Sequence, residues 1–179
     1  MLSKEKKNVE RVHVSACLLG EKVRYDGDDR LCNDGILQGW RKSGRVVPFC
    51  PEIAGGFPTP RPPAEISNGQ GGSAVLSGNA EVLEAGGNDV TEKFIAGARA
   101  ALQKASELRI RVAVMKEGSP SCGSTYTYDG SFAGGTVDKP GVAAALLLVH
   151  GVFVFSETQL AQADEKIRSL EANGAVSPN

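Results

Sequence analysis

The sequence has little of what nucleic-acid-binding and membrane proteins depend on. Aromatic residues make up 6% of the 179 residues, and 20 lysines and arginines stand against 21 acidic residues, a net charge of −1. Nucleic-acid binders neutralise phosphates with clustered basic side chains and stack bases on aromatic rings, so this composition argues against such a partner. No apolar run approaches the roughly 18 residues of a membrane-spanning helix. The sequence therefore predicts neither a nucleic-acid partner nor a membrane span.

The amino-terminal segment also lacks a secretory signal. Met1 to Arg11 is rich in lysine and glutamate and has no apolar central region. We therefore expect a cytoplasmic protein, in which structural disulfides are rare. The four cysteines, at positions 17, 32, 50 and 122, are then better explained as metal ligands or catalytic thiols than as disulfide partners.

The length fits one domain, and no linker, repeat or charge block divides the chain. We predict a flexible lead over residues 1–10, one α/β domain over residues 11–174 and a tail over residues 175–179. Strands are predicted at Val12–Ala16, Arg45–Phe49, Glu81–Glu84, Arg111–Met115 and Val152–Phe155. Helices are predicted at Asp34–Lys42, from a capping-box-like start at Asp89 to Leu108, at Pro140–Gly151 and at Thr158–Asn173. This alternation predicts a Rossmann-like domain, with a mostly parallel sheet flanked by helices.

Three cysteines follow three of the predicted strands. Cys17 comes directly after the first strand, Cys50 directly after the second, and Cys122 lies in a turn shortly after the strand Arg111–Met115. Ligand sites in parallel sheets lie beyond the carboxyl ends of the strands, so neighbouring strands would bring all three thiols to one crevice. The spacing matches no zinc-finger or ferredoxin pattern. Cys32 follows no strand, and we do not count it as a ligand.

The number of cysteines helps to decide which metal centre they could hold. Zinc held by three thiolates usually takes a fourth ligand, and the only two histidines, His13 and His150, are better explained by packing or capping. A [4Fe–4S] cluster held by three cysteines keeps one iron open, which suits a Lewis acid that binds a soft substrate atom. Three cysteines thus favour a catalytic cluster over an electron carrier. For each cysteine alone, the alternative is a small buried hydrophobe.

Three ordered motifs carry a resemblance to a known family. They are Ser15–Gly20 with Val23–Gly27, Cys50–Gly56 with Pro60–Glu65, and Lys116–Gly123. Together they resemble the motifs of a bacterial family that was long a domain of unknown function and that includes the 2-thiouracil desulfurases. Many relatives carry a further cysteine where this chain has Val23, so no thiol acts at that position here.

The resemblance implies a [4Fe–4S] cluster held by Cys17, Cys50 and Cys122. It implies that the fourth iron takes the sulfur of a thiolated pyrimidine such as 2-thiouracil, and that water replaces this sulfur without net redox change. It also implies a carboxylate and a serine near the cluster, which map to Glu52 and to either Ser119 or Ser121.

The chemistry of the residues fits this mapping. Exclusion from water raises a carboxyl pKa toward neutrality, which suits Glu52 for acid–base work, although the residue is also a candidate salt-bridge partner for Arg61. Arg24, Asp26, Arg61 and Lys116 are candidate substrate-binding residues. Alternatively, Arg24 and Arg61 tie loops down through Asp26 and Glu65, a structural role that we favour slightly. The glycine-rich turn from Tyr128 to Thr136 fits a lid or a plain hairpin equally well.

Three functions remain compatible with these residues. The first is desulfuration of a small thiolated base, and the second is another non-redox hydrolyase or lyase reaction at an open iron. The third is a non-catalytic module that binds metal or sulfide. We favour the first, with a small-molecule thiobase as substrate and a monomeric or homodimeric protein.

Overall fold

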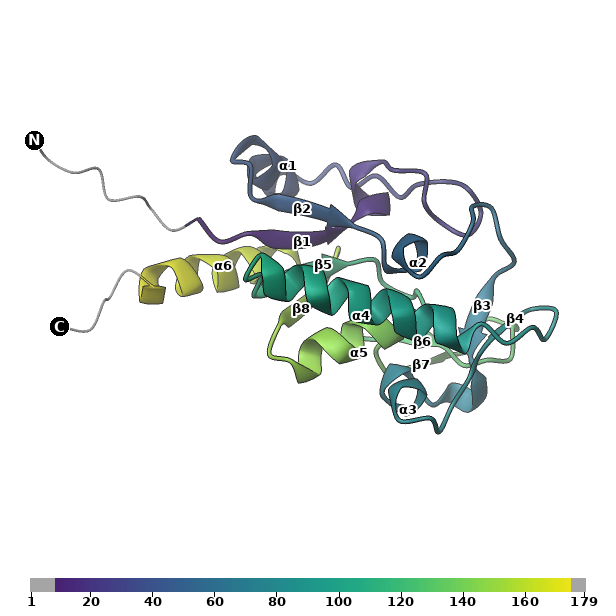
Figure 1. Ribbon diagram of the computed structural model, residues 1–179. Helices are drawn as coiled ribbons and strands as arrows, with labels where there is room; N and C mark the ends of the chain where they lie inside the picture. Colours follow the sequence, from purple (N-terminus) through teal and green to yellow (C-terminus); the bar gives the residue numbers. More distant parts are fainter. Residues whose placement is uncertain (1–8, 175–179) are drawn as a thin grey trace, which may run out of the picture.

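Residues 9–174 are described by a computed structural model (Figure 1), and most of the predicted lead and tail lies outside these residues. The elements in chain order are β1 (Val12–Ser15), the 3-10 helix η1 (Ala16–Leu19), α1 (Gly35–Lys42), β2 (Val46–Phe49), α2 (Pro51–Ala54), β3 (Ala64–Ile66), the 3-10 helix η2 (Ser67–Gly69), α3 (Gly72–Leu76), β4 (Val82–Glu84), α4 (Thr91–Glu107), β5 (Val112–Met115), β6 (Thr127–Tyr128), β7 (Thr136–Val137), α5 (Val142–Val149), β8 (Phe153–Ser156) and α6 (Leu160–Gly174).

The main sheet has four parallel strands in the order β2-β1-β5-β8. Val12 of β1 pairs with Val46 of β2 on one side and with Val112 of β5 on the other. Every residue of β1 and β5 is buried, as expected for central strands covered on both faces. Pro48 is tolerated in β2 because β2 is an edge strand, where one row of backbone groups needs no partner.

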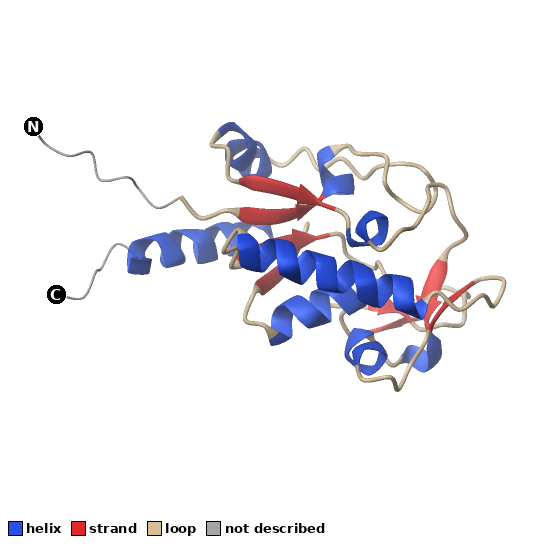
Figure 2. Ribbon diagram, in the orientation of Figure 1, coloured by secondary structure: helices blue, strands red, loops and turns tan. Residues whose placement is uncertain are grey.

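Helices cover both faces of this sheet (Figure 2). The alternate residues Val112 and Val114 of β5 pack with apolar residues of α1 and α6, whereas Ala113 and Met115 pack with α4 and α5. This period of two divides the core into two layers, one on each face of the sheet. The predicted α/β fold, a parallel sheet flanked by helices, is confirmed.

Two further hairpin-like pairs lie outside the main sheet. The predicted strand Glu81–Glu84 is present as β4, but β4 pairs antiparallel with β3 and is not part of the parallel sheet. The turn from Tyr128 to Thr136 joins β6 to β7 in an antiparallel hairpin. Both pairs lie near the amino-terminal end of α4 (Figure 1).

The start of α5 differs from the prediction. Pro140 was expected as the first helical residue, and this was wrong, because α5 begins at Val142 and Gly141 precedes it. A Cβ on Gly141 would lie 2.6 Å from the carbonyl oxygen of Pro120, so only glycine allows the chain before α5 to lie this close. Within residues 9–174, no helix is long and apolar enough to cross a membrane.

Candidate active site

Three cysteines line one cavity of about 490 Å³ at the carboxyl ends of the parallel strands. Cys17 lies in η1 directly after β1, and Cys50 directly follows β2 and caps the start of α2. Cys122 lies in the turn between β5 and β6. Cys17 and Cys122 are buried, Cys50 is half-buried, and all three are free thiols. The three strands that carry them are neighbours, which is why positions so far apart in the sequence meet.

Close backbone contacts fix two of these cysteines. Cys50 precedes α2, which packs on α4 where Gly97 allows contact, since a Cβ at that position would lie 2.1 Å from the carbonyl oxygen of Pro51. The turn that holds Cys122 rests on the start of α5, because the backbone N–H of Val142 donates to Pro120 and that of Ala143 donates to Ser121, each over 2.9 Å. The first N–H groups of a helix have no hydrogen-bond partner within it, and here the carbonyl groups of the turn accept them.

Burial sets the charge state of the thiols. It raises the pKa of Cys17 to about 11, with a further contribution from the nearby Cys50. Burial also raises the pKa of Cys50, and it raises that of Cys122 strongly, assisted by Cys50 and Glu52. As free groups the three thiols are therefore protonated at neutral pH. They lie close enough to disfavour one another's ionisation. A bound metal centre would favour the thiolate form instead, because its positive charge replaces the protons.

This donor set fits an iron–sulfur cluster better than a single ion. Among the described residues, no three of His, Cys, Asp and Glu lie close enough together to hold one metal ion. A cluster spreads its cysteine ligands over separate irons, so it does not need the sulfurs to converge on one point. No histidine lines the cavity. Three soft thiols without a nitrogen donor match the ligands of iron–sulfur centres.

The residues left out of the ligand set have other roles. His13 lies inside β1 with its ring 5.5 Å from that of Phe49, and His150 caps α5 through the carbonyl of Leu146, 2.9 Å from Nδ1. The predicted packing and capping roles are confirmed. Cys32 lies outside the cavity lining, and its backbone N–H donates to the carbonyl of Leu18.

Glu52 and Ser119 face each other across the cavity wall, with 3.5 Å between Ser119 Oγ and Glu52 Oε1. The same Ser119 oxygen accepts the backbone N–H groups of Ser121 (3.1 Å) and Cys122 (3.0 Å), so its own proton is directed to Glu52. Ser121 instead is 1% exposed, does not line the cavity, and its hydroxyl has no hydrogen-bond partner within residues 9–174. The structure thus separates two serines that the sequence left equivalent.

Arg61 is held beside Glu52. Its guanidinium forms an ion pair with Glu52 and donates to the carbonyl of Pro62 over 2.8 Å, and it lies 4.6 Å from the ring centre of Phe57. The predicted pairing of Arg61 with Glu65 was wrong, because Glu65 accepts the backbone N–H groups of the β6–β7 hairpin. The alternative weighed for Glu52, a salt bridge to Arg61, is the arrangement observed.

The other polar candidates are also paired. Arg24 lies 3.5 Å from Asp26, as predicted for a loop tie, and of these two only Arg24 lines the cavity. Lys116 lines the cavity and pairs with Glu157. Three tyrosines and a carboxylate that were not predicted as site residues also line the cavity, namely Tyr25, Tyr126, Tyr128 and Glu117. Tyr25 lies inside the first motif, Glu117 inside the third, and Tyr128 at the start of the glycine-rich turn, and these positions were their signals in the sequence.

Comparison with known proteins gives concordant results. Residues 12–159 match the model of the family described as 2-thiouracil desulfurase. The chain is 42% identical over 147 residues to the uncharacterized protein YbbK of Bacillus subtilis (strain 168), covering 82% of this chain and 95% of that protein. It is also similar to the solved structure of the [4Fe-4S]-dependent thiouracil desulfidase TudS. This match has a TM-score of 0.80 and 45% sequence identity, and it covers 89% of this chain and 98% of that one.

Proposed function

The chain belongs to the 2-thiouracil desulfurase family, and from this premise we propose that it is a [4Fe–4S]-dependent desulfurase of a small thiolated pyrimidine. The reaction consumes one water and exchanges the ring C=S for C=O, giving the oxo base and hydrogen sulfide without net redox change. The observation that carries the proposal is the meeting of three free thiols, Glu52 and Ser119 in one cavity. We place the reaction in the cytoplasm, on a free small molecule, with the protein a monomer or homodimer.

Cys17, Cys50 and Cys122 would hold the cluster, with one iron free of protein ligands. When bound, the cluster supplies a Lewis-acidic iron that attracts the sulfur of the substrate. The protein itself supplies a cavity whose volume suits a small ligand, about 490 Å³. Its three rigid attachment points are the ends of β1 and β2 and the turn supported by α5.

Glu52 is the group that moves protons in this proposal. One carboxylate oxygen is held by Arg61, and the other faces the hydroxyl of Ser119. From this position Glu52 accepts the protons of the attacking water one at a time and passes both to the leaving sulfur, which departs as hydrogen sulfide, while Ser119 orients the reacting groups. Arg24 and Lys116 remain candidate contacts of the substrate at the cavity wall.

The test begins with anaerobically reconstituted protein. We expect about four irons per chain, the count of one [4Fe–4S] cluster, and hydrogen sulfide release from 2-thiouracil. Cys17→Ala, Cys50→Ala and Cys122→Ala should each lose both properties. Cys32→Ala is the matched control and should keep them. Absence of iron in the wild-type protein would refute the cluster, and iron without sulfide release from any thiolated base would favour another open-iron hydrolyase.

The two serines give a second comparison. Glu52→Gln and Ser119→Ala should keep the iron and lose turnover, by about 10²–10⁴-fold for Glu52→Gln, as for a lost general acid–base group. Ser121→Ala should keep both iron and turnover, because its hydroxyl is buried away from the cavity. Equal losses in the two serine variants would contradict the assignment of Ser119.

A further inference from the structure

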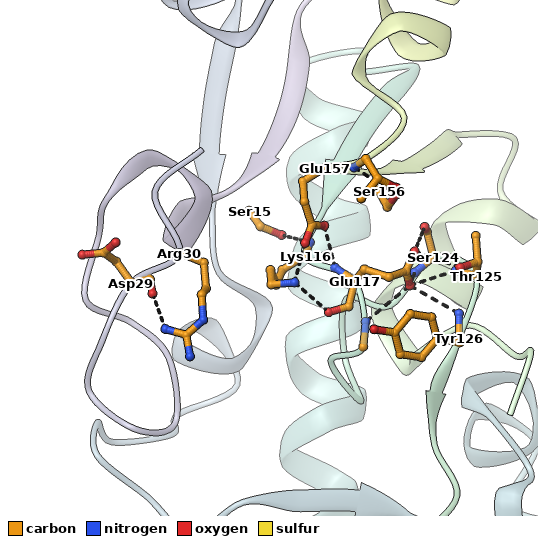
Figure 3. A network of polar contacts seen from close by, with 12 residues as sticks. Ser15, Asp29, Arg30, Lys116, Glu117, Ser124, Thr125, Tyr126, Ser156 and Glu157 are labelled. Atoms are coloured by element: carbon orange, nitrogen blue, oxygen red, sulfur yellow. Dashed lines mark hydrogen bonds and ion pairs between the residues drawn. The ribbon is translucent and has the colours of Figure 1, made fainter. Parts of the chain in front are cut away.

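The carboxylate of Glu117 accepts hydrogen bonds from the far end of the loop that carries Ser119 and Cys122, and Figure 3 shows these bonds to Ser124, Thr125 and Tyr126. Oε1 of Glu117 accepts three consecutive backbone N–H groups, from Ser124 (2.8 Å), Thr125 (3.1 Å) and Tyr126 (3.3 Å). Its Oε2 accepts the side-chain hydroxyls of Ser124 (2.8 Å) and Thr125 (2.9 Å). One side chain therefore joins the two ends of the turn.

The number and kind of these bonds indicate an ionised acceptor. Successive backbone N–H groups that point at one centre form an anion-binding concavity, and hydrogen bonds to a charged acceptor are stronger than neutral ones. Burial alone would raise the pKa of Glu117, but the hydrogen bonds from Thr125, Ser124 and Tyr126 outweigh burial and hold the pKa below its ordinary value. Glu117 is thus a carboxylate at neutral pH.

The backbone of Glu117 is itself anchored to the main sheet. Its N–H donates to Glu157, which follows β8, over 2.8 Å, and its carbonyl accepts from Lys116 Nζ over 3.1 Å. Lys116 forms an ion pair with Glu157, and its backbone N–H donates to the hydroxyl of Ser15 at the end of β1, over 3.0 Å. The carboxylate of Glu117 is therefore a fixed point, and the loop is shaped around it.

We propose that Glu117 is a positioning residue, whose ionised carboxylate holds the loop 117–126 so that Cys122 and Ser119 face the cavity. The proposal rests on the proposed function in one respect, namely that Cys122 is a ligand and Ser119 acts on the substrate. Among the described residues, the carboxylate of Glu117 hydrogen-bonds to residues 118 and 124–126 and to neither of those two side chains. It acts through the backbone that joins residues 118–126.

The primary test uses Glu117→Gln in the full-length chain. Glutamine has the same size but no charge. Its NH2 group takes the place of one carboxylate oxygen, and an NH2 group cannot accept the hydrogen bonds that the loop donates. The control is Glu107→Gln, because Glu107 is exposed on α4 and, within residues 9–174, its side chain hydrogen-bonds only to that of Gln103. In metal-free protein, alkylation of Cys122, resolved by peptide mass, should accelerate about tenfold or more in Glu117→Gln, as expected when a charge-assisted hydrogen bond is lost. Alkylation of Cys17 should keep its rate, and Glu107→Gln should match the wild type at both cysteines.

A pH profile separates positioning from general destabilisation. The charged side chains of Lys116 and Glu157 contact the backbone of Glu117 and pair with each other. The folded-state pKa of Glu117 is lowered, so the protection of residues 118–126 against amide exchange should be full above the unfolded pKa and fall as the pH drops through the folded pKa. Glu117→Gln should show low protection in this segment without that step, while α4 and the main sheet keep wild-type protection.

Reconstituted protein gives a further readout. The cluster of Glu117→Gln, followed by its visible absorption, should be lost to a chelator faster than that of the wild type. If Glu117→Gln fails to fold, the double variant Ser124→Ala with Thr125→Val removes only the two hydroxyl donors and should still accelerate alkylation of Cys122. Wild-type alkylation rates and wild-type protection of residues 118–126 in these variants would overturn the proposal. Failure of the wild-type protein to bind iron would instead refute the desulfurase proposal, since the thiol and exchange measurements need no metal.

Discussion

Replacing Arg61 with methionine should cost the protein much of its stability, because this arginine is the only ion-pair partner of Glu52 within the described residues. The side chain of Arg61 is 3% exposed and that of Glu52 is 13% exposed. Methionine keeps an apolar stem but removes the guanidinium, which lies over the rings of Phe57 and Phe94. The carboxylate of Glu52 then stays largely buried, and within the described residues its remaining hydrogen-bond contact is the hydroxyl of Ser119 at 3.5 Å.

The magnitude follows from this burial. Removing one partner of a buried ion pair costs about 3–5 kcal/mol, because the other charge is left uncompensated. The loss of the cation over the aromatic rings adds to this cost. If the cost comes mainly from the stranded carboxylate, adding Glu52→Gln to Arg61→Met should recover part of it. A coupling energy of about 2 kcal/mol is in the range measured for residues in direct contact.

The assay is urea unfolding of the full-length chain at pH 7, at equal metal content, for the wild type, the two single variants and the double variant. Arg168→Met is the matched control, since Arg168 is 71% exposed and pairs with Asp164 at the surface of α6. It should lower the free energy of unfolding by less than about 0.5 kcal/mol. A cost for Arg61→Met no greater than that of the control, or simple additivity in the double variant, would show that the unpaired Glu52 carboxylate is not the source of the lost stability.

Two further outcomes are expected. The pKa of His13 is lowered from 6.5 to about 4 by complete burial, so the unfolded chain binds a proton that the folded chain does not, and stability should fall by about 3 kcal/mol between pH 6.5 and pH 4. His13→Leu should reduce this loss in urea titrations at pH 7 and pH 5, and an unchanged pH dependence would contradict it. Gly97→Ala should destabilise the chain by about 1–3 kcal/mol and weaken iron retention, because its Cβ meets the carbonyl of Pro51 next to Cys50. Its control, Gly39→Ala on the exposed face of α1, has open space and should be neutral or stabilising.

The framework of the fold could be predicted because it depends on patterns within the sequence. Short runs rich in β-branched and aromatic residues predicted β1, β2, β5 and β8. Because the carboxyl ends of parallel strands lie at the same edge of a sheet, Cys17 and Cys50 could be placed together. The apolar run Val142–Val149 indicated a buried helix, and α5 is buried over most of its length. These features need no knowledge of how the loops pack.

The details of the site depend on loop geometry and could not be predicted in the same way. Ser119 and Ser121 flank one proline, and only the turn of the backbone decides that one faces the cavity and the other the interior. Glu52 and Glu65 are both near Arg61 in sequence, and the choice between them follows from the docking of α2 against α4. The short elements α2, α3 and β3 span too few residues to show a period.

The distribution of the cysteines along the chain has a consequence for how the protein matures. Cys17 and Cys50 belong to the first third of the chain, whereas the turn of Cys122 needs the N–H groups of Val142 and Ala143 for support. During synthesis the first two thiols therefore leave the ribosome long before the third can take its place. Contacts between such distant segments form late in folding, because closing long loops costs entropy. The complete thiol set is therefore assembled only once the turn of Cys122 has packed against α5, and a cluster held by all three cysteines would be completed late in maturation.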